Sequence, residues 1–188
     1  MNDALHVATR PLFSPAPPQE DVARVETIFT MIRDDLGFLP DPIRLYSTSP
    51  PLLEALLGYV KYFRGHQRLS QTLTAMIRYL VSERAQCRFC IDLNEGFLVN
   101  LGADLDAVRA ARVDMDKAPL DERERVLLRI AVTAMDHPEL IGEADMQAAR
   151  AQGWTDRDVF DAVVQAASNR SLNLILRTFK VEVQGSFD

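Results

Sequence analysis

The chain has 188 residues, which is enough for one domain with a hydrophobic core of its own. Hydrophobic residues make up 47% of it and charged residues 26%, the usual balance of a globular protein, and the net charge of −6 argues against a nucleic-acid surface. The sequence has neither an apolar run of about 18 residues nor the apolar core of a signal peptide, so we expect a cytoplasmic protein that does not enter membranes.

The N-terminal stretch is rich in proline. Four prolines lie within residues 1–19, a composition typical of an extended arm and not of a helix. Two interpretations stay open, a disordered tail and an arm that packs on a partner subunit, where Leu12 and Phe13 would be buried. Residues 20–188 are expected to form a single all-helical domain.

Apolar residues recur at helical spacing along the rest of the chain, and no stretch alternates with the period of a strand. Prolines, glycines and capping residues mark where the helices begin and end. The expected helices cover residues 19–36, 42–46 and 50–64, a helix after Ser70, a cysteine-bearing helix ending at Gly102, residues 104–112, 121–135 and 143–151, a helix after Thr155, and a last helical or mixed segment over 170–183.

The helix expected over 121–135 is apolar almost all round, so it should lie centrally. Its start at Asp121 also stands at the same offset from Ser70 as Gly153 does from Gly102. This correspondence indicates either an internal duplication of a helical unit or a coincidence of caps, and both remain open.

Cys87 and Cys90 are the two cysteines of the chain. Residues three apart on a helix lie roughly 5–6 Å from each other, a separation that a disulfide tolerates. If Cys87 begins a helix, the free N–H groups and the helix dipole would favour a thiolate, and Arg84 and Arg88 could add to this. Two inert buried thiols are the alternative. A zinc site is weakly supported without further ligands, and Ile91 stands where haem attachment requires histidine.

Taken together, these features resemble the carboxymuconolactone decarboxylase/alkylhydroperoxidase D-like superfamily, and more closely its uncharacterised peroxidase-related branch. The matching stretches are Leu36-Gly37-Phe38-Leu39-Pro40, Leu69-Ser70, Cys87-x-x-Cys90, Leu101-Gly102 and Asn169-Arg170. The resemblance implies an all-α fold assembled as a homo-oligomer. It also implies a CxxC pair that reduces small peroxides with electrons from an external dithiol reductant, with no cofactor and no metal.

In alkylhydroperoxidase D the cysteines work with a glutamate and a histidine that relay protons. At those two positions this chain has Ala75 and Asn94, so the resemblance implies weakened catalysis. It also implies that Cys90 attacks the peroxide and that Cys87 resolves the product. Besides Asn94, the candidate supporting residues are Glu83 and His66, although a surface ion pair for Glu83 and a solvated loop position for His66 are the commoner cases.

Two functions therefore compete. The first is a thiol-dependent peroxidase with an antioxidant role, and the second is a non-catalytic oligomeric protein on the same fold that binds a ligand or senses redox state. A lactone decarboxylase is a third reading, and it would need Glu83 or His66 as its base. The pKa and the accessibility of the thiols are the properties that distinguish the peroxidase from the non-catalytic protein.

Overall fold

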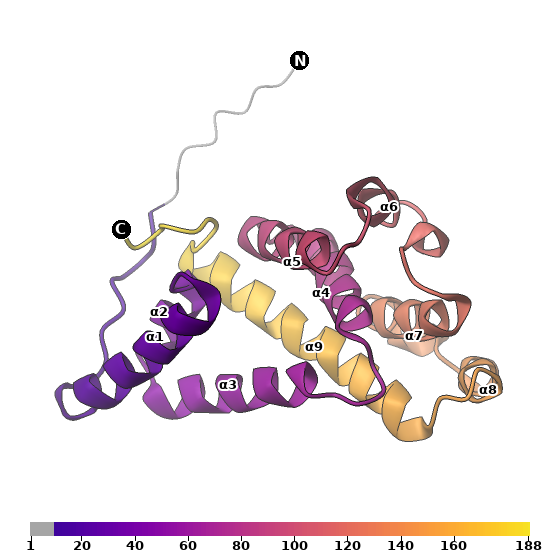
Figure 1. Cartoon of the computed structure of the whole chain (residues 1–188), viewed down its shortest axis with the longest axis horizontal. Helices are drawn as coiled ribbons and strands as arrows, with labels where there is room; N and C mark the ends of the chain where they lie inside the picture. Colours follow the sequence, from indigo (N-terminus) through magenta and orange to yellow (C-terminus); the bar gives the residue numbers. More distant parts are fainter. Residues whose placement is uncertain (1–9) are drawn as a thin grey trace, which may run out of the picture. The chain divides into compact units, whose positions relative to one another are not determined.

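The protein is described by a computed structural model that covers residues 10–188, so the first nine residues of the expected arm lie outside it. Within the described residues every regular element is a helix and there is no strand, which confirms the all-α prediction (Figure 1). Across residues 10–188, no helix is both long and apolar enough to cross a membrane. The α-helices are α1 (Val22–Leu36), α2 (Asp41–Tyr46), α3 (Pro50–Arg64), α4 (Gln71–Ala85), α5 (Arg88–Asn100), α6 (Leu105–Ala110), α7 (Glu122–Thr133), α8 (Glu143–Ala151) and α9 (Asp156–Phe179).

The chain divides into two compact units, Met1–Lys61 with Ile175–Asp188, and Tyr62–Leu174. The single domain expected over residues 20–188 stays a prediction.

In the first unit, α1, α2 and the start of α3 share a small apolar core. Its buried side chains are Val25, Ile28, Phe29, Leu39, Ile43 and Leu53. The C-terminal segment closes onto α2, where the backbone N–H of Ser186 donates to Asp41 Oδ2 at 2.7 Å. Burial raises the pKa of Asp41, and the hydrogen bond from Ser186 opposes that shift.

The described part of the N-terminal arm, residues 10–18, forms neither helix nor strand, and its extended character stays a prediction. It lies against the end of α9, because the Leu12 backbone N–H donates to Phe179 O at 3.2 Å. The Phe13 ring meets the Phe179 ring edge to face, with 5.3 Å between their centroids. Docking of this arm on a partner subunit stays a prediction.

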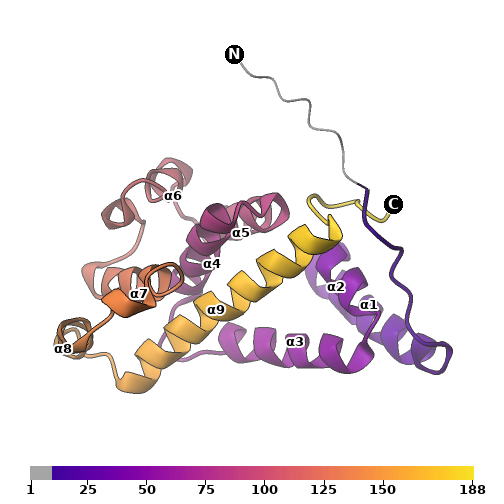
Figure 2. The same ribbon diagram turned by 180° about the vertical axis from the view of Figure 1, so that it is seen from behind.

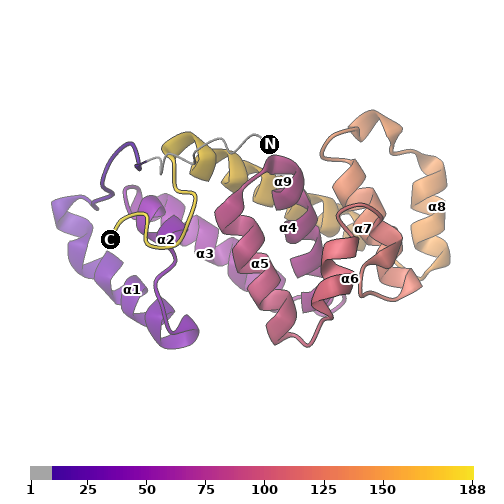
Figure 3. The ribbon, with the colours of Figure 1, turned by 90° about the horizontal axis from the view of Figure 1, so that it is seen from above.

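The second unit is organised around α4, which packs against α5 and α7 (Figure 3). Ser70 caps α4 by accepting a hydrogen bond from the Leu73 N–H at 3.0 Å, as predicted. Ten of the fifteen residues of α4 are buried, so it presents apolar side chains over much of its circumference. The helix ends at Gln86, whose left-handed backbone (φ 56°) turns the chain directly into α5. The central position expected for α7 agrees with the burial of six of its residues.

The C-terminal helix differs from the prediction. The sequence indicated one helix after Thr155 and a separate helical or mixed segment over 170–183, whereas α9 runs without a break from Asp156 to Phe179 (Figure 2). No proline or glycine interrupts that stretch, and Lys180, with φ 62°, follows its end. The Asn169 side chain, next to the expected start of a new segment at residue 170, bonds laterally to Ser82 of α4 and leaves the helix intact. The internal duplication stays a prediction.

Candidate thiol site

The two cysteines lie at the start of α5, directly after the turn that ends α4. Cys87 is the N-cap residue, with extended backbone, and Cys90 lies within the first helical turn. Both are free thiols and both are buried, with 1% of the surface of Cys87 and 3% of the surface of Cys90 exposed. Their Sγ atoms are 2.8 Å apart. A disulfide of about 2.05 Å would therefore need only a small approach of the two sulphur atoms.

The electrostatics of the pair distinguish its two members. The hydrogen bond with Cys87 raises the pKa of Cys90, and burial and the charge of an ionised Cys87 act in the same direction. Hydrogen bonds with Asn173 and Ser82 oppose this shift only in part. The N-cap position of Cys87, where the helix dipole favours negative charge, makes Cys87 the candidate for the first thiolate, although its side chain makes no capping hydrogen bond.

A group of neutral polar side chains lies beside Cys90, and we call Ser82, Asn169 and Asn173 the amide cluster. All three are buried, and they come from α4 and α9. Asn169 Nδ2 donates to Ser82 Oγ at 3.0 Å, and Asn173 Nδ2 donates to the same oxygen at 3.2 Å. Sequence reasoning missed this cluster. Its signal was a pair of asparagines four residues apart, and therefore on one face of a helix.

Asn94 lies at the position where the relay histidine would stand, and both ends of its amide are engaged. Its Nδ2 donates to the backbone oxygen of Cys90 at 2.8 Å, and its Oδ1 accepts from Arg78 Nε at 2.9 Å. Asn94 thus braces the first turns of α5 against α4. Ala75, at the position of the relay glutamate, is a buried side chain on α4 that can neither give nor take a proton.

Glu83 does not support the thiols in this structure, because it belongs to a charged cluster around Tyr79. Its Oε2 lies 3.6 Å from Arg112 Nε. The Tyr79 hydroxyl donates to Glu95 Oε1 at 2.7 Å, and Arg112 Nη2 and Arg109 Nη2 reach the Glu95 oxygens at 2.8 and 3.0 Å. Hydrogen bonding from Arg109 lowers the pKa of Glu95, and Tyr79 adds to the shift. The ion-pair interpretation of Glu83 is therefore the one that the structure favours.

This cluster predicts a pH-dependent cost for the Tyr79→Phe substitution. Loss of a hydrogen bond to an ionised carboxylate should lower the free energy of unfolding by roughly 2 kcal/mol at neutral pH. Because the folded pKa of Glu95 is depressed, its contribution is present above the unfolded value of about 4.3 and is lost as the pH falls. Urea unfolding of both proteins should show a smaller difference near pH 3 than near pH 7. A difference that does not change with pH would contradict this assignment.

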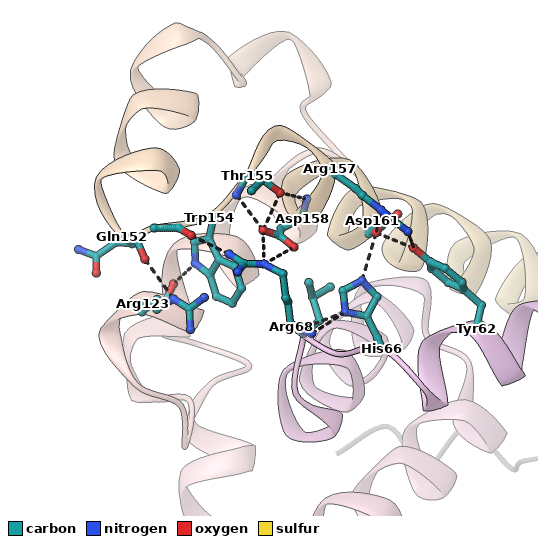
Figure 4. Close-up of polar contacts among 12 residues, drawn as sticks. Tyr62, His66, Arg68, Arg123, Gln152, Trp154, Thr155, Arg157, Asp158 and Asp161 are labelled. Carbon is teal, nitrogen blue, oxygen red and sulfur yellow. Dashed lines mark hydrogen bonds and ion pairs between the residues drawn. The ribbon is translucent and has the colours of Figure 1, made fainter.

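His66 lies too far from the cysteines to act on them. It precedes the 15-residue helix α4 and the cysteines follow it, a separation of roughly 22 Å along the axis. Figure 4 shows the ring directed at Asp161, with Nε2 3.1 Å from Oδ2. Its Nδ1 accepts the backbone N–H groups of Leu69 (2.9 Å) and Arg68 (3.2 Å), which places the ring proton on Nε2. The solvated loop position was also wrong, because only 8% of the side chain is exposed.

The arginines expected to favour a thiolate are paired elsewhere. Arg84 Nη1 donates to Asp136 Oδ2 at 2.9 Å, and Arg88 Nε donates to Asp92 Oδ2 at 2.8 Å. The helix N-terminus and the amide cluster are therefore the groups left to stabilise negative charge on the sulphurs. Among the described residues, His, Cys, Asp and Glu form no group of three that could hold a metal ion.

Comparison with known proteins places this geometry on a known scaffold. No protein-family model and no curated protein matches the chain. Solved structures do match it, among them an uncharacterised peroxidase-related protein from Silicibacter sp. TM1040 (TM-score 0.81, 24% identity, covering 95% of this chain and 96% of that one). A second is an uncharacterised peroxidase-related protein with an alkylhydroperoxidase D core from Ralstonia eutropha JMP134 (0.79, 21%, 95% and 96%). A third is a cysteine-to-alanine variant of the debrominase Bmp8 in complex with 2,3,4-tribromopyrrole (0.76, 18%, 95% and 95%). The chain therefore has the alkylhydroperoxidase D-like helical fold that the resemblance implied.

Proposed function

We propose that the protein is a thiol-dependent reductase of small hydroperoxides that works through Cys87 and Cys90. The observation that carries this proposal is the pair of free thiols with Sγ atoms 2.8 Å apart at the start of α5. The fold shared with peroxidase-related proteins supports it as well, and with it a role in antioxidant defence.

The cycle has three balanced steps. The Cys87 thiolate attacks an oxygen of the hydroperoxide, the O–O bond breaks, and the departing alkoxide takes a proton to leave as an alcohol, with Cys87 now a sulfenic acid. The Cys90 thiol loses its proton, and the thiolate attacks the Cys87 sulphur and displaces hydroxide. The proton that Cys90 released converts the hydroxide to water. The resulting disulfide then accepts two electrons and two protons from an external dithiol, whose own sulphurs become a disulfide.

This assignment exchanges the roles that the resemblance implied, in which Cys90 attacks and Cys87 resolves. The reason is the raised pKa of Cys90 beside the N-cap position of Cys87. Burial of both thiols and the paired state of the nearby charges point to a slow enzyme, because no acid–base relay speeds the first step.

The direct test is the loss of thiols from the reduced protein after addition of hydrogen peroxide or an organic hydroperoxide, measured from about pH 5 to pH 9. We expect both thiols to be lost together, with mass spectrometry locating a Cys87–Cys90 disulfide that a dithiol reverses. The rate should rise with pH, because only the thiolate attacks. Thiol loss no faster than that of free cysteine would reject the peroxidase function.

A redox-sensing or ligand-binding role is the second candidate, and the burial of both thiols favours it. A sensor needs only an infrequent, reversible switch between dithiol and disulfide, and it can do without rapid turnover. Stoichiometric disulfide formation without repeated turnover in the presence of a dithiol would favour this candidate.

The substrate panel should extend beyond peroxides. One solved structure of this fold is named as a debrominase and holds a brominated pyrrole. Two thiols that become a disulfide release two electrons, which is also what replacement of a carbon-bound bromine by hydrogen requires. A brominated pyrrole is therefore the second substrate class to assay, with bromide release as the readout.

We also propose that the chain is a cytoplasmic homo-oligomer. Large apolar side chains are exposed on α9, with Phe160 at 66% and Leu174 at 54% of their surfaces. Such side chains are typical of surfaces that a second subunit covers.

A further inference from the structure

The amide cluster has a hydrogen-bonding arrangement that leaves one donor for Cys90. Asn173 Oδ1 lies 3.2 Å from Asn169 Nδ2, a donor that also faces Ser82 Oγ (3.0 Å) and Arg78 O (3.1 Å), and this contact favours the orientation in which the oxygen of the Asn173 amide faces Asn169. One N–H of Asn173 Nδ2 donates to Ser82 Oγ at 3.2 Å. The amide nitrogen has two N–H groups, so the second is available to the Cys90 sulphur, with which Asn173 is hydrogen-bonded.

Ser82 provides a second, adjustable donor. Its Oγ donates to the backbone oxygen of Arg78 at 2.6 Å and accepts from both asparagines. A hydroxyl proton rotates at little cost, so it can turn from Arg78 O to a negatively charged sulphur. Ser82 is also hydrogen-bonded with Cys90, so no movement of the backbone is required.

We propose that Asn173, oriented by Asn169, and Ser82 are positioning residues that hold Cys90 as a thiolate while it attacks the sulfenic acid on Cys87. The inference rests on the proposed function and specifies its second step. Before oxidation, the hydrogen bond and the charge of Cys87 work against ionisation of Cys90. The charge no longer acts when Cys87 becomes a neutral sulfenic acid, so the hydrogen bonds from the amide cluster then oppose burial without that repulsion.

The groups that bear on the sulphur come from three helices. Cys87 lies at the start of α5, Ser82 belongs to α4 and Asn173 belongs to α9. The last two are neutral at every pH of interest, so they stabilise a thiolate without competing for its proton. Such donors replace part of what the absent glutamate and histidine would contribute.

The first test measures Cys90 alone, in the Cys87→Ser protein, by following thiolate absorbance in the ultraviolet during a pH titration. Asn173→Leu removes the amide and keeps the branching at Cγ, and we expect the pKa of Cys90 to rise by about one unit or more. Asn173→Asp, which places a carboxylate against the sulphur, should raise it further. Ser82→Ala should raise it by a smaller amount, since one donor remains. No change in all three variants would overturn the proposal.

Thr74→Val is the matched control. It removes another buried hydroxyl of α4 that donates to a backbone oxygen, that of Gln71 at 3.1 Å, and it lies eight residues before Ser82, roughly 12 Å along the helix. We expect it to leave the Cys90 titration unchanged. Should Asn173→Leu fail to fold, Ser82→Ala, which deletes a single oxygen atom, decides the question.

A second test uses the intact pair and no peroxide. Dithiodipyridine reacts first with one thiol, and the second thiol then closes the Cys87–Cys90 disulfide, with each step releasing one thiopyridone. Asn173→Leu should slow the second release about threefold or more for the one-unit shift expected in the titration, because the thiolate fraction falls about tenfold while the nucleophilicity of the remaining thiolate rises in part, and the first release serves as the internal reference. The proposal would be overturned if the second thiopyridone were released at the same rate from Asn173→Leu and from the wild type. If peroxide fails to react with the wild-type protein, the proposed function is rejected, while the titration still decides the role of the amide cluster.

Discussion

Replacement of Cys87 by serine is expected to lower the rate of peroxide-driven thiol loss by on the order of 100-fold or more, because a serine hydroxyl does not ionise near neutral pH. Cys87 is the N-cap of α5, so it lies at the end of the helix where the dipole favours negative charge. The same peroxide at the same concentration should be compared in both proteins by counting the remaining thiols.

The Cys90→Ser protein is the informative partner of that experiment. It should keep the first step and then stall, because no second thiol remains to condense with the sulfenic acid. Trapping with dimedone and mass spectrometry should place the adduct on Cys87. If the adduct forms on Cys90 in the Cys87→Ser protein instead, the roles are those implied by the family resemblance and the geometric assignment is wrong.

The Asp158→Ala substitution should have the largest effect on stability among the changes considered, lowering the free energy of unfolding by about 3 kcal/mol at neutral pH. Asp158 is buried near the start of α9 (Figure 4). Its Oδ2 accepts from Thr155 N and Thr155 Oγ1, both at 2.7 Å, and Arg68 Nε reaches the two oxygens at 2.8 and 2.9 Å. The carboxylate therefore caps one helix and ties it to the segment before another. Because 45% of the Arg68 side chain is exposed, water offsets part of the loss.

The pH dependence of this effect has a definite sign. Burial by itself would raise the pKa of Asp158, but the hydrogen bonds from Thr155 and Arg68 outweigh it, and the net shift is downward. The contribution of Asp158 to the free energy of unfolding is thus present above the pKa of about 3.9 that the side chain has in the unfolded chain. It is lost as the pH falls through the lower pKa that the side chain has in the folded protein. Urea unfolding at about pH 7 and about pH 3 should show the difference between wild type and variant shrinking in acid.

Asp158→Asn is the matched control for that measurement. The amide keeps the size of the side chain and one acceptor oxygen but loses the charge, so an intermediate cost is expected at neutral pH. If Asp158→Ala unfolds at the same urea concentration as the wild type at pH 7, Asp158 does not hold the start of α9 in place.

Most of the local structure of this chain was accessible from the sequence, for a physical reason. Caps and helical periodicity depend on residues within a few positions of each other, so Ser70, Gly37 and Asp121 marked helix boundaries that the structure confirms. The approach of Cys87 to Cys90 is local in the same sense. It follows from the spacing of three residues and from the start of α5 at these residues.

The surroundings of the thiols were decided by tertiary structure alone. Ser82 and Asn173 are 91 residues apart, and only the packing of α9 beside α4 brings both to Cys90. Tertiary structure likewise paired Glu83 with Arg112 and His66 with Asp161. The sequence thus determined most of the helices and the approach of the two cysteines, because both arise from near neighbours. The side chains around that pair come from segments that are distant in the sequence. A periodic pattern indicates local structure and does not predict which distant segments come into contact.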